Sequence, residues 1–282
     1  MAEFICKDYP GAIKKLGIKV QALFFVEVRK FMQVIRDHFQ RALYRYGWDT
    51  RCRNLVPAHI LKAVLRDIPM RTEPMLLDIG CGQLGVAAFL PQVSVMGTDI
   101  DPPVASTPNL TFQLGSITAL PFADRSFPLV SCIDVLEHLS PQDRERGISE
   151  LVRVATDGIL VAYPQGKLAA AVDEEFRRDC EQHGKASPSW LIEHQRQPYP
   201  VNSTIVEQLN SAVRATGRKA TISLSYCEPA SVSRIVRWAA ARSNLLYAAV
   251  NLFFGVLLPF VPSPNDSNGY RAIALIELSA DG

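Results

Sequence analysis

A glycine-rich loop and an acidic residue beyond it are the part of this sequence best suited to binding a small polar ligand. The loop, DIGCGQLG over 78–85, follows a short apolar segment, and Asp99 ends the next apolar segment, 19 residues after Gly80. Glycines let the backbone approach a ligand closely, and a helix that begins after the loop favours polar or anionic groups at its N-terminus. The spacing satisfies the dinucleotide fingerprint, with Asp99 on the ribose, and it also permits another adenosyl cofactor. A tight turn without any ligand is the plainer alternative.

A second group of chemically active residues, Asp134, Glu137 and His138, follows the apolar segment 127–133. Loops at the carboxyl ends of strands line the ligand crevice of open parallel sheets. In such a place His138 has the chemistry of a general base that removes a proton from a hydroxyl group. The alternative is a histidine that bonds to backbone at the start of a helix. No histidines and carboxylates are spaced along the chain as metal ligands, so we expect no metal site.

The elements that must position these residues alternate between strands and helices from residue 75 onward. Apolar runs predict strands over 75–79, 93–100, 110–114, 127–133 and 158–163. A helix is expected from Pro141, with Ser140 as its N-cap. This alternation predicts an α/β fold with a mainly parallel, doubly wound sheet. Only the proline-rich residues 101–109 separate the second and third strands, which leaves room for a turn and not for a helix.

The flanking regions predict an organisation in two parts. Residues 1–72 are expected to form a basic helical N-terminal extension. Residues 73–282 are expected to form one domain with two additions, a charged insertion over 164–200 and a hydrophobic excursion over 229–269. The further elements expected are helices over 12–47, 57–67 and 202–216, strands over 220–227 and 270–278, an amphipathic stretch over 232–242 and an apolar run over 245–261.

Three segments in a fixed order carry a family resemblance. They are LLDIGCGQLG over 76–85, VMGTDID over 95–101 and LGSITALPFADRSFPLVSCIDVLEHLSP over 114–141. Together they resemble class I S-adenosylmethionine-dependent methyltransferases, and most closely bacterial methyltransferase domains of the small-molecule and glycan type. The family implies a Rossmann-like, seven-stranded, mainly parallel sheet that ends in an antiparallel hairpin. Here the strands over 220–227 and 270–278 would form that hairpin.

The resemblance also implies the cofactor S-adenosylmethionine and the residues around it. Asp99 would accept hydrogen bonds from both ribose hydroxyls, Ile100 would flank the adenine, and Asp134 would lie near the reactive sulfonium. Ser116 stands where the family usually has an acid, and it would read the adenine amino group together with the backbone of Ile117. The methionine part would be surrounded by the loop residues Asp78, Gly80, Cys81, Gly82 and Gly85.

The reaction that the family implies is methyl transfer, an in-line displacement in which positioning can supply most of the rate. We expect O-methylation of a small-molecule, glycan or lipid-linked acceptor, with His138 as the candidate catalytic residue. An NAD-dependent oxidoreductase would share the glycine loop and Asp99, and a non-catalytic cofactor-binding protein would keep the fold. An RNA methyltransferase would agree with the basic N-terminus. No RNA-binding module accompanies that segment, so we expect no nucleic acid partner.

Charge and composition indicate where the protein acts. The 282 residues carry a net charge of +2, and residues 1–53 alone carry +6, so a basic arm precedes a mildly acidic body. This arm and the apolar run predict an amphiphilic acceptor or peripheral membrane contact through 12–47 and 245–261. A single membrane span is not expected, because the strands on either side of the apolar run must pair in one sheet. Widely spaced cysteines and the lack of a signal-peptide pattern predict a reduced, cytoplasmic setting.

Overall fold

The computed structural model describes residues 47–69, 74–82, 85–103, 107–260 and 263–279. Contacts between Cα positions divide the chain into two units, Met1–Tyr46 and Gly47–Gly282. The first unit holds nearly all of the basic helix expected over 12–47 and lies outside the described residues. The second unit contains the sheet and all of the expected site residues.

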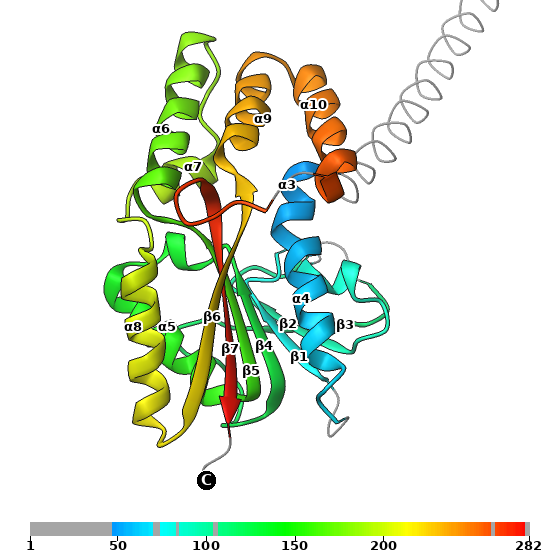
Figure 1. Ribbon diagram of the computed structural model, residues 1–282, viewed down its shortest axis with the longest axis vertical. Coiled ribbons are helices and arrows are strands. Elements are labelled where there is room, and N and C mark those ends of the chain that lie inside the picture. Colours follow the sequence, from blue (N-terminus) through cyan, green and yellow to red (C-terminus); the bar gives the residue numbers. More distant parts are fainter. Residues whose placement is uncertain (1–46, 70–73, 83–84, 104–106, 261–262, 280–282) are drawn as a thin grey trace, which may run out of the picture. The chain divides into compact units, whose positions relative to one another are not determined.

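A seven-stranded sheet forms the centre of the second unit (Figure 1). The strand order is β3-β2-β1-β4-β5-β7-β6. Neighbouring strands from β3 to β5 are parallel, whereas β7 runs antiparallel to both β5 and β6. The strands are Leu76–Ile79 (β1), Val95–Asp99 (β2), Leu110–Leu114 (β3), Phe127–Ile133 (β4), Ala155–Pro164 (β5), Lys219–Pro229 (β6) and Gly269–Ser279 (β7). The parallel sheet with an antiparallel terminal pair, expected from the sequence, is confirmed.

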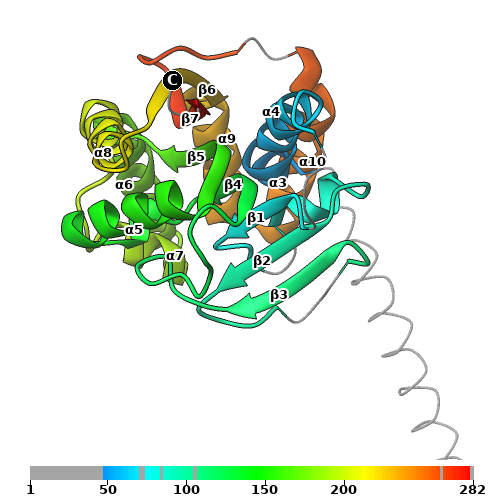
Figure 2. The ribbon, with the colours of Figure 1, turned by 90° about the horizontal axis from the view of Figure 1, so that it is seen from below.

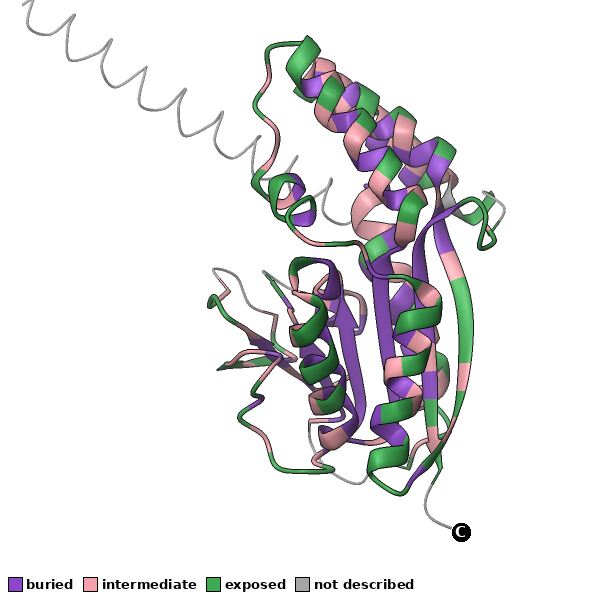
Figure 3. Ribbon diagram, turned by 90° about the vertical axis from the view of Figure 1, so that its left-hand side faces the viewer, coloured by how far each residue is buried: buried purple, intermediate pink, exposed green. Residues whose placement is uncertain are grey.

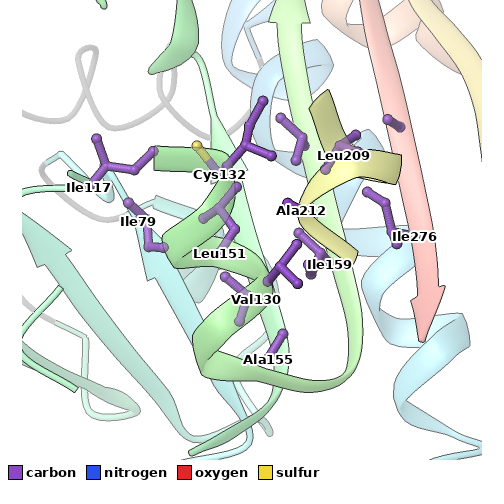
Figure 4. Close-up of a cluster of buried hydrophobic side chains, with 14 of the residues drawn as sticks. Ile79, Ile117, Val130, Cys132, Leu151, Ala155, Ile159, Leu209, Ala212 and Ile276 are labelled. Carbon is purple, nitrogen blue, oxygen red and sulfur yellow. The ribbon is translucent and has the colours of Figure 1, made fainter. Parts of the chain in front are cut away.

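Helices on both faces explain why the inner strands are apolar along their whole length. Every residue of β4 is buried, and Figure 3 shows the inner strands buried from end to end. Strands covered on both faces read as continuous apolar runs, which is why the sequence locates them well. On one face, α5 (Pro141–Val154) and α8 (Asn202–Ala215) close a cluster that includes Leu151, Leu209 and Ile276 (Figure 4).

The opposite face is covered by α4 (Val56–Leu65) and by η2, a 3₁₀ helix over Gly85–Phe89 (Figure 2). Ala58 and Leu61 of α4 belong to one buried cluster with side chains of β1, β2 and β4. The described part of the extension expected over 1–72 therefore packs on the sheet. Its apolar side chains take the place that a crossover helix occupies in other doubly wound sheets.

The connections around the first three strands are shorter than those of a regular doubly wound sheet. The helix that the sequence predicted after the glycine loop is the short 3₁₀ helix η2, which has five residues. Pro91 explains why it is short, because proline lacks a backbone N–H and disfavours a helical conformation in the residue before it. Between β2 and β3, residues 100–103 and 107–109 form no helix, in agreement with the expected turn.

A group of helices lies beyond the carboxyl ends of the parallel strands (Figure 1). The insertion over 164–200 forms two helices there, which its charged and proline-containing sequence did not indicate. The group thereby covers the edge of the sheet at which the expected site residues lie. Its members are α3 (Trp48–Thr50), the π-helical turn η1 (Arg51–Leu55), α6 (Gly166–Gln182), α7 (Ser189–His194), α9 (Ala230–Arg242), α10 (Asn244–Leu257) and η4 (Leu258–Phe260).

The apolar run expected over 245–261 forms α10, which packs on α9 and on α3. The Trp48 ring meets Phe254 edge to face with ring centroids 5.9 Å apart, and the Asn251 amide oxygen accepts a hydrogen bond from the Asp49 N–H at 3.1 Å. The other side of the run remains in solvent. Four large apolar side chains there are at least 60% exposed: Leu245, Phe253, Val256 and Phe260. Within the described part of the chain, no helix is long and apolar enough to cross a membrane.

The buried Trp48 provides a test of how firmly α10 is held. Trp48→Ala should lower the free energy of unfolding by about 3–5 kcal/mol, because it leaves a cavity among side chains of α9 and α10. Trp238→Ala is the matched control, since that ring is 44% exposed and its loss should cost about 1 kcal/mol or less. Denaturant unfolding of both variants measures the difference. Equal effects would contradict the packing described for α10.

Candidate active site

The loop after β1 takes a backbone shape that depends on glycine at two positions. Gly80 and Gly82 have φ angles of +70° and +52°. A Cβ on Gly80 would lie 2.2 Å from Val135 Cγ2, so the loop rests against the turn that follows β4. A Cβ on Gly82 would meet no atom within 4 Å. Gly82 therefore presents bare backbone to open space, where a ligand can approach.

Asp78, at the base of the loop, is buried and bonded to the protein. Its Oδ1 accepts a hydrogen bond from Ser131 Oγ at 2.7 Å, and its Oδ2 accepts one from the Val86 N–H at 3.0 Å. A Cβ on Gly85, whose φ is +52°, would lie 2.0 Å from Asp78 Oδ2. Burial raises the pKa of Asp78 to about 6, against the effect of both hydrogen bonds. Asp78 and Gly85 thus stabilise the loop from its buried side. Neither the Asp78 carboxylate nor the Cβ position of Gly85 faces open space.

Asp99 lies at the end of β2 and joins this loop to the next. Its Oδ2 accepts a hydrogen bond from the Gly82 N–H at 2.9 Å, and its Oδ1 accepts one from the Asp101 N–H at 3.3 Å. The neighbouring Ile100 is 71% exposed, and Leu114 at the end of β3 is also exposed. A carboxylate beside exposed apolar side chains suits a ribose attached to a flat base.

The remaining cofactor residues expected from the sequence are less open. The Ser116 hydroxyl lies 3.0 Å from that of Thr118 and also accepts a hydrogen bond from the Thr118 N–H. Ile117 is buried and packs against α5 at Gly147, so that its backbone is the part left for a ligand. Cys81 is buried under the loop, and burial raises the pKa of its thiol to about 12. Ser116 and Ile117 therefore stay as predicted adenine contacts, and the Cys81 thiol is neutral at pH 7.

Asp134, directly after β4, is held by two arginines. Arg271 Nε and Nη2 lie 2.8 and 2.6 Å from its carboxylate oxygens, and Arg53 Nε lies 2.7 Å from Oδ2. Burial alone would raise the pKa of Asp134, but the two guanidinium groups outweigh it and lower this pKa to about 2. Arg271 also pairs with Glu228 at the end of β6. Asp134 therefore fixes the turn after β4, and it remains a predicted neighbour of the cofactor.

His138 lies in η3 (Leu136–His138), the 3₁₀ turn that follows Asp134. Its side chain is 32% exposed, and Nδ1 lies 3.1 Å from Glu193 Oε2 in α7. Burial and the adjacent His194 lower the pKa of His138 below its usual 6.5, although Glu193 acts the other way. The ring is thus neutral at pH 7 and has one nitrogen lone pair available for a proton or a metal.

Sequence analysis did not single out the buried group around Asp173 of α6. The Asp173 carboxylate accepts hydrogen bonds from Tyr199 and Tyr270 and lies 3.2 Å from both His194 Nδ1 and Arg237 Nη2. Burial would raise the pKa of Asp173, but Arg237, His194 and Tyr199 together lower it. The sequence does show His194 and Tyr199 in the insertion, where they could belong to a lid over the substrate or to a surface excursion, but it gives no sign that Asp173 joins them. This group fixes α7 over the turn after β4.

Glu137 completes the group of polar side chains over this edge. It is 1% exposed, and neither carboxylate oxygen has a hydrogen-bond partner among the described residues. Burial and the charge of Asp134 raise the pKa of Glu137 well above its usual value. Ligand atoms of Glu137, His138 and His194 all lie within 4.8 Å of one another. No metal site was expected from the spacing of these residues along the chain. Folding, however, brings His194 next to Glu137 and His138.

Comparison with known families agrees with this topology. A family model described as a methyltransferase domain matches residues 77–162, from β1 into β5. The match covers the glycine loop, Asp99 and the turn after β4, and the sheet has the antiparallel terminal pair that the sequence resemblance implied. Residues 77–162 therefore form a methyltransferase domain. The class I S-adenosylmethionine-dependent family expected from the sequence is confirmed for this part of the chain.

Curated relatives of this methyltransferase include two plant enzymes. The chain is 28% identical over 164 residues to norajmaline N-methyltransferase of Rauvolfia serpentina. This alignment covers 50% of the chain and 56% of that protein. The chain is also 30% identical over 121 residues to ajmaline N-methyltransferase of the same plant, which covers 38% of this chain and 41% of that protein. The chain thus spans about half the length of the curated relatives it matches.

Two solved structures are similar in fold to this chain. An S-adenosylmethionine-dependent methyltransferase of Thermotoga maritima aligns over 88% of this chain and 96% of its own, with 12% identity and a TM-score of 0.47. Phosphoethanolamine N-methyltransferase 2 of Haemonchus contortus, in complex with S-adenosylhomocysteine, aligns over 79% of this chain and 53% of its own. In that alignment the identity is 17% and the TM-score is 0.44.

The residues at the carboxyl edge of the sheet fit the cofactor of this family. The open space beside Gly82 leaves room for the methionine part, because a Cβ there would touch nothing within 4 Å. Asp99 has the charge that hydrogen-bonds ribose hydroxyls, and the exposed side chain of Ile100 offers an apolar surface for adenine. Gly82, Asp99 and Ile100 are therefore the residues that would hold S-adenosylmethionine.

The buried carboxyl of Asp78 predicts a pH dependence of stability. Folding raises its pKa from 3.8 to about 6, so the folded state binds more protons between these values. The stability that Asp78 contributes is complete below about pH 4 and falls by about 3 kcal/mol as the pH rises through 6. Asp78→Asn removes this titration. Denaturant unfolding of both proteins at pH 4 to 7 should show the wild type losing stability relative to the variant, and a constant difference would contradict the prediction.

Proposed function

We propose that this methyltransferase transfers the methyl group of S-adenosylmethionine to a hydroxyl group of an amphiphilic acceptor. The observation that carries the proposal is that the loop with Gly80 and the turn with His138 touch at one edge of the sheet. When bound, the cofactor supplies a methyl group that its sulfonium already activates. The chain's own residues then have to orient the acceptor, exclude water and deal with the acceptor's proton.

The acceptor atom is assigned from the state of His138. A hydroxyl must lose its proton as it is methylated, whereas a neutral amine can attack without a base. His138 is neutral at pH 7 and is oriented by the Glu193 carboxylate 3.1 Å from Nδ1, so it is suited to bring about that loss. The names of the two plant relatives specify nitrogen acceptors. An amine is therefore the alternative acceptor that product analysis must distinguish.

The amphiphilic character of the acceptor is argued from α10. Its exposed apolar side chains are connected to the site through η1. Arg51 Nη1 donates a hydrogen bond to the Gly255 carbonyl oxygen at 2.6 Å, and Arg53 pairs with Asp134. A small molecule, glycan or lipid-linked intermediate with an apolar part could contact this surface while its hydroxyl reaches His138. The proposal includes peripheral membrane contact through the run 245–261 in a cytoplasmic protein, which the free, buried cysteines of the described chain support.

Removing the Asp99 carboxylate tests the cofactor part of the proposal. Asp99→Ala should weaken S-adenosylhomocysteine binding by roughly 2–4 kcal/mol, because two charge-assisted hydrogen bonds are lost. Asp101→Ala is the matched control, since Asp101 contacts Asp99 only through its backbone N–H, and its affinity should stay within about twofold. Calorimetry with S-adenosylhomocysteine and with NAD measures both. Unchanged affinity in Asp99→Ala, or tight NAD binding by the wild type, would overturn the assignment.

Removing the His138 ring tests the acceptor part. His138→Ala should lower turnover by about 10²–10⁴ while the affinity for S-adenosylhomocysteine hardly changes. The assay transfers a labelled methyl group to a lipid extract and to a water-soluble extract, and product analysis identifies the methylated atom. We expect an O-methylated product in the lipid extract. A labelled amine, or turnover of the variant within a few fold of the wild type, would contradict the proposed role of His138.

A further inference from the structure

Three side chains that are common metal ligands converge over the carboxyl end of β4. Glu137 and His138 are neighbours in η3, and His194 ends α7, 56 residues further along the chain. Their ligand atoms lie within 4.8 Å of one another. Around an ion bound at about 2.1 Å, ligand atoms lie roughly 3–4 Å apart, so a small closure of the three side chains would complete the site.

Both histidine rings are oriented in the way metal-binding histidines usually are. His138 Nδ1 lies 3.1 Å from Glu193 Oε2, and His194 Nδ1 lies 3.2 Å from Asp173 Oδ2. A ligating histidine typically donates its second N–H to a carboxylate, which fixes the ring and leaves the other nitrogen for the metal. His194 Nε2 is indeed directed towards Glu137, 3.7 Å from Oε1. Each histidine is thus paired with a carboxylate through Nδ1, and His194 directs its other nitrogen towards the buried Glu137 carboxylate.

The buried carboxylate of Glu137 is a second, independent observation that points to a cation site. Its side chain is 1% exposed, and both of its oxygens are without a hydrogen-bond partner among the residues that the structure describes. A buried carboxylate in this state costs several kcal/mol unless a proton or a cation neutralises it. The nearby guanidinium groups of Arg53 and Arg271 pair with Asp134. A cation bound between Glu137 and the two histidine rings would provide the charge that the protein itself does not.

We propose that Glu137, His138 and His194 bind one divalent transition-metal ion, such as Zn²⁺, Co²⁺ or Mn²⁺. Two imidazole nitrogens and one carboxylate oxygen suit these ions better than Mg²⁺ or Ca²⁺, which prefer oxygen ligands. Three protein ligands also leave coordination positions open, as in catalytic and not in purely structural sites. The turn that carries two of the ligands adjoins the glycine loop, because Val135, directly before η3, lies against Gly80.

The chemical role of the ion rests on the proposed hydroxyl methylation. An acceptor hydroxyl that coordinates the ion has a lower pKa and releases its proton to water. The resulting oxygen forms the bond to the methyl carbon, while the carbon–sulfur bond breaks and its electron pair stays on sulfur. His138 then acts as a ligand and not as the proton acceptor. Its loss lowers turnover in either case, so metal binding must be measured directly.

The test is a titration of the purified, chelator-treated full-length protein with Co²⁺, followed by its visible absorption spectrum and by competition with Zn²⁺. We expect one Co²⁺ per chain in the wild type. His138→Ala and Glu137→Gln should each weaken binding by at least about a hundredfold, and Glu193→Gln by about 10–100-fold, because it only orients His138. His183→Ala is the matched control, since His183 is exposed and its Nδ1 lies 2.8 Å from a carbonyl oxygen of its own helix.

Several outcomes would overturn the metal site. The proposal is wrong if the wild type binds no Co²⁺ at millimolar concentration. It is also wrong if His138→Ala and Glu137→Gln bind Co²⁺ with the same affinity as the His183→Ala control. Circular dichroism of each variant verifies folding, and His138 is exposed enough for its truncation to be tolerated. If the protein binds the metal but methylates an acceptor other than a hydroxyl, the proposed function is wrong and the metal site is confirmed. If O-methylation is unaffected by chelators and no metal binds, the metal site is wrong and the proposed function stands.

Discussion

The buried Arg271 is the interaction on which the arrangement of the site depends. Its guanidinium is 4% exposed and lies between Asp134, at the end of β4, and Glu228, at the end of β6. Both acids have positive φ angles, 53° and 62°, which non-glycine residues adopt only where their surroundings impose it. Each of the three charges would be costly to bury alone, so they must be buried together. The turn after β4, which carries the polar residues of the site, therefore has one position relative to the terminal strands.

A second buried charge, Asp173, fixes the position of the insertion in a similar way. It gathers His194, Tyr199, Arg237 and Tyr270 from α7, the following loop, α9 and β7. Segments separated along the chain thus share one carboxylate, and none of them can leave without exposing or unpairing it. This contact places α7 above η3. The cover over η3 is built in this way from segments outside the region that the family model matches.

Most of the fold could be predicted from the sequence, and the exceptions have physical causes. The strands β3 and β4 were predicted with their observed ends, because doubly covered strands are apolar throughout. α6 and α7 were missed, because the insertion is polar and their few buried residues serve contacts with helices far away in sequence. The helix expected after the glycine loop is only a 3₁₀ turn, since Pro91 ends it. Local signals located the apolar elements well and the polar ones poorly.

The candidate site likewise has one part that local sequence signals predict and one part that they do not. The sequence by itself determined the loop that is predicted to hold the cofactor, because Gly80, Gly82 and Asp99 lie in short segments whose backbone shape and spacing are local properties. It also identified His138 as a residue with catalytic chemistry. Only the tertiary structure decided what surrounds His138, since Glu193 and His194 come from an insertion more than 50 residues away. Their position follows from α7 packing over a buried carboxylate, and no spacing along the chain encodes that contact.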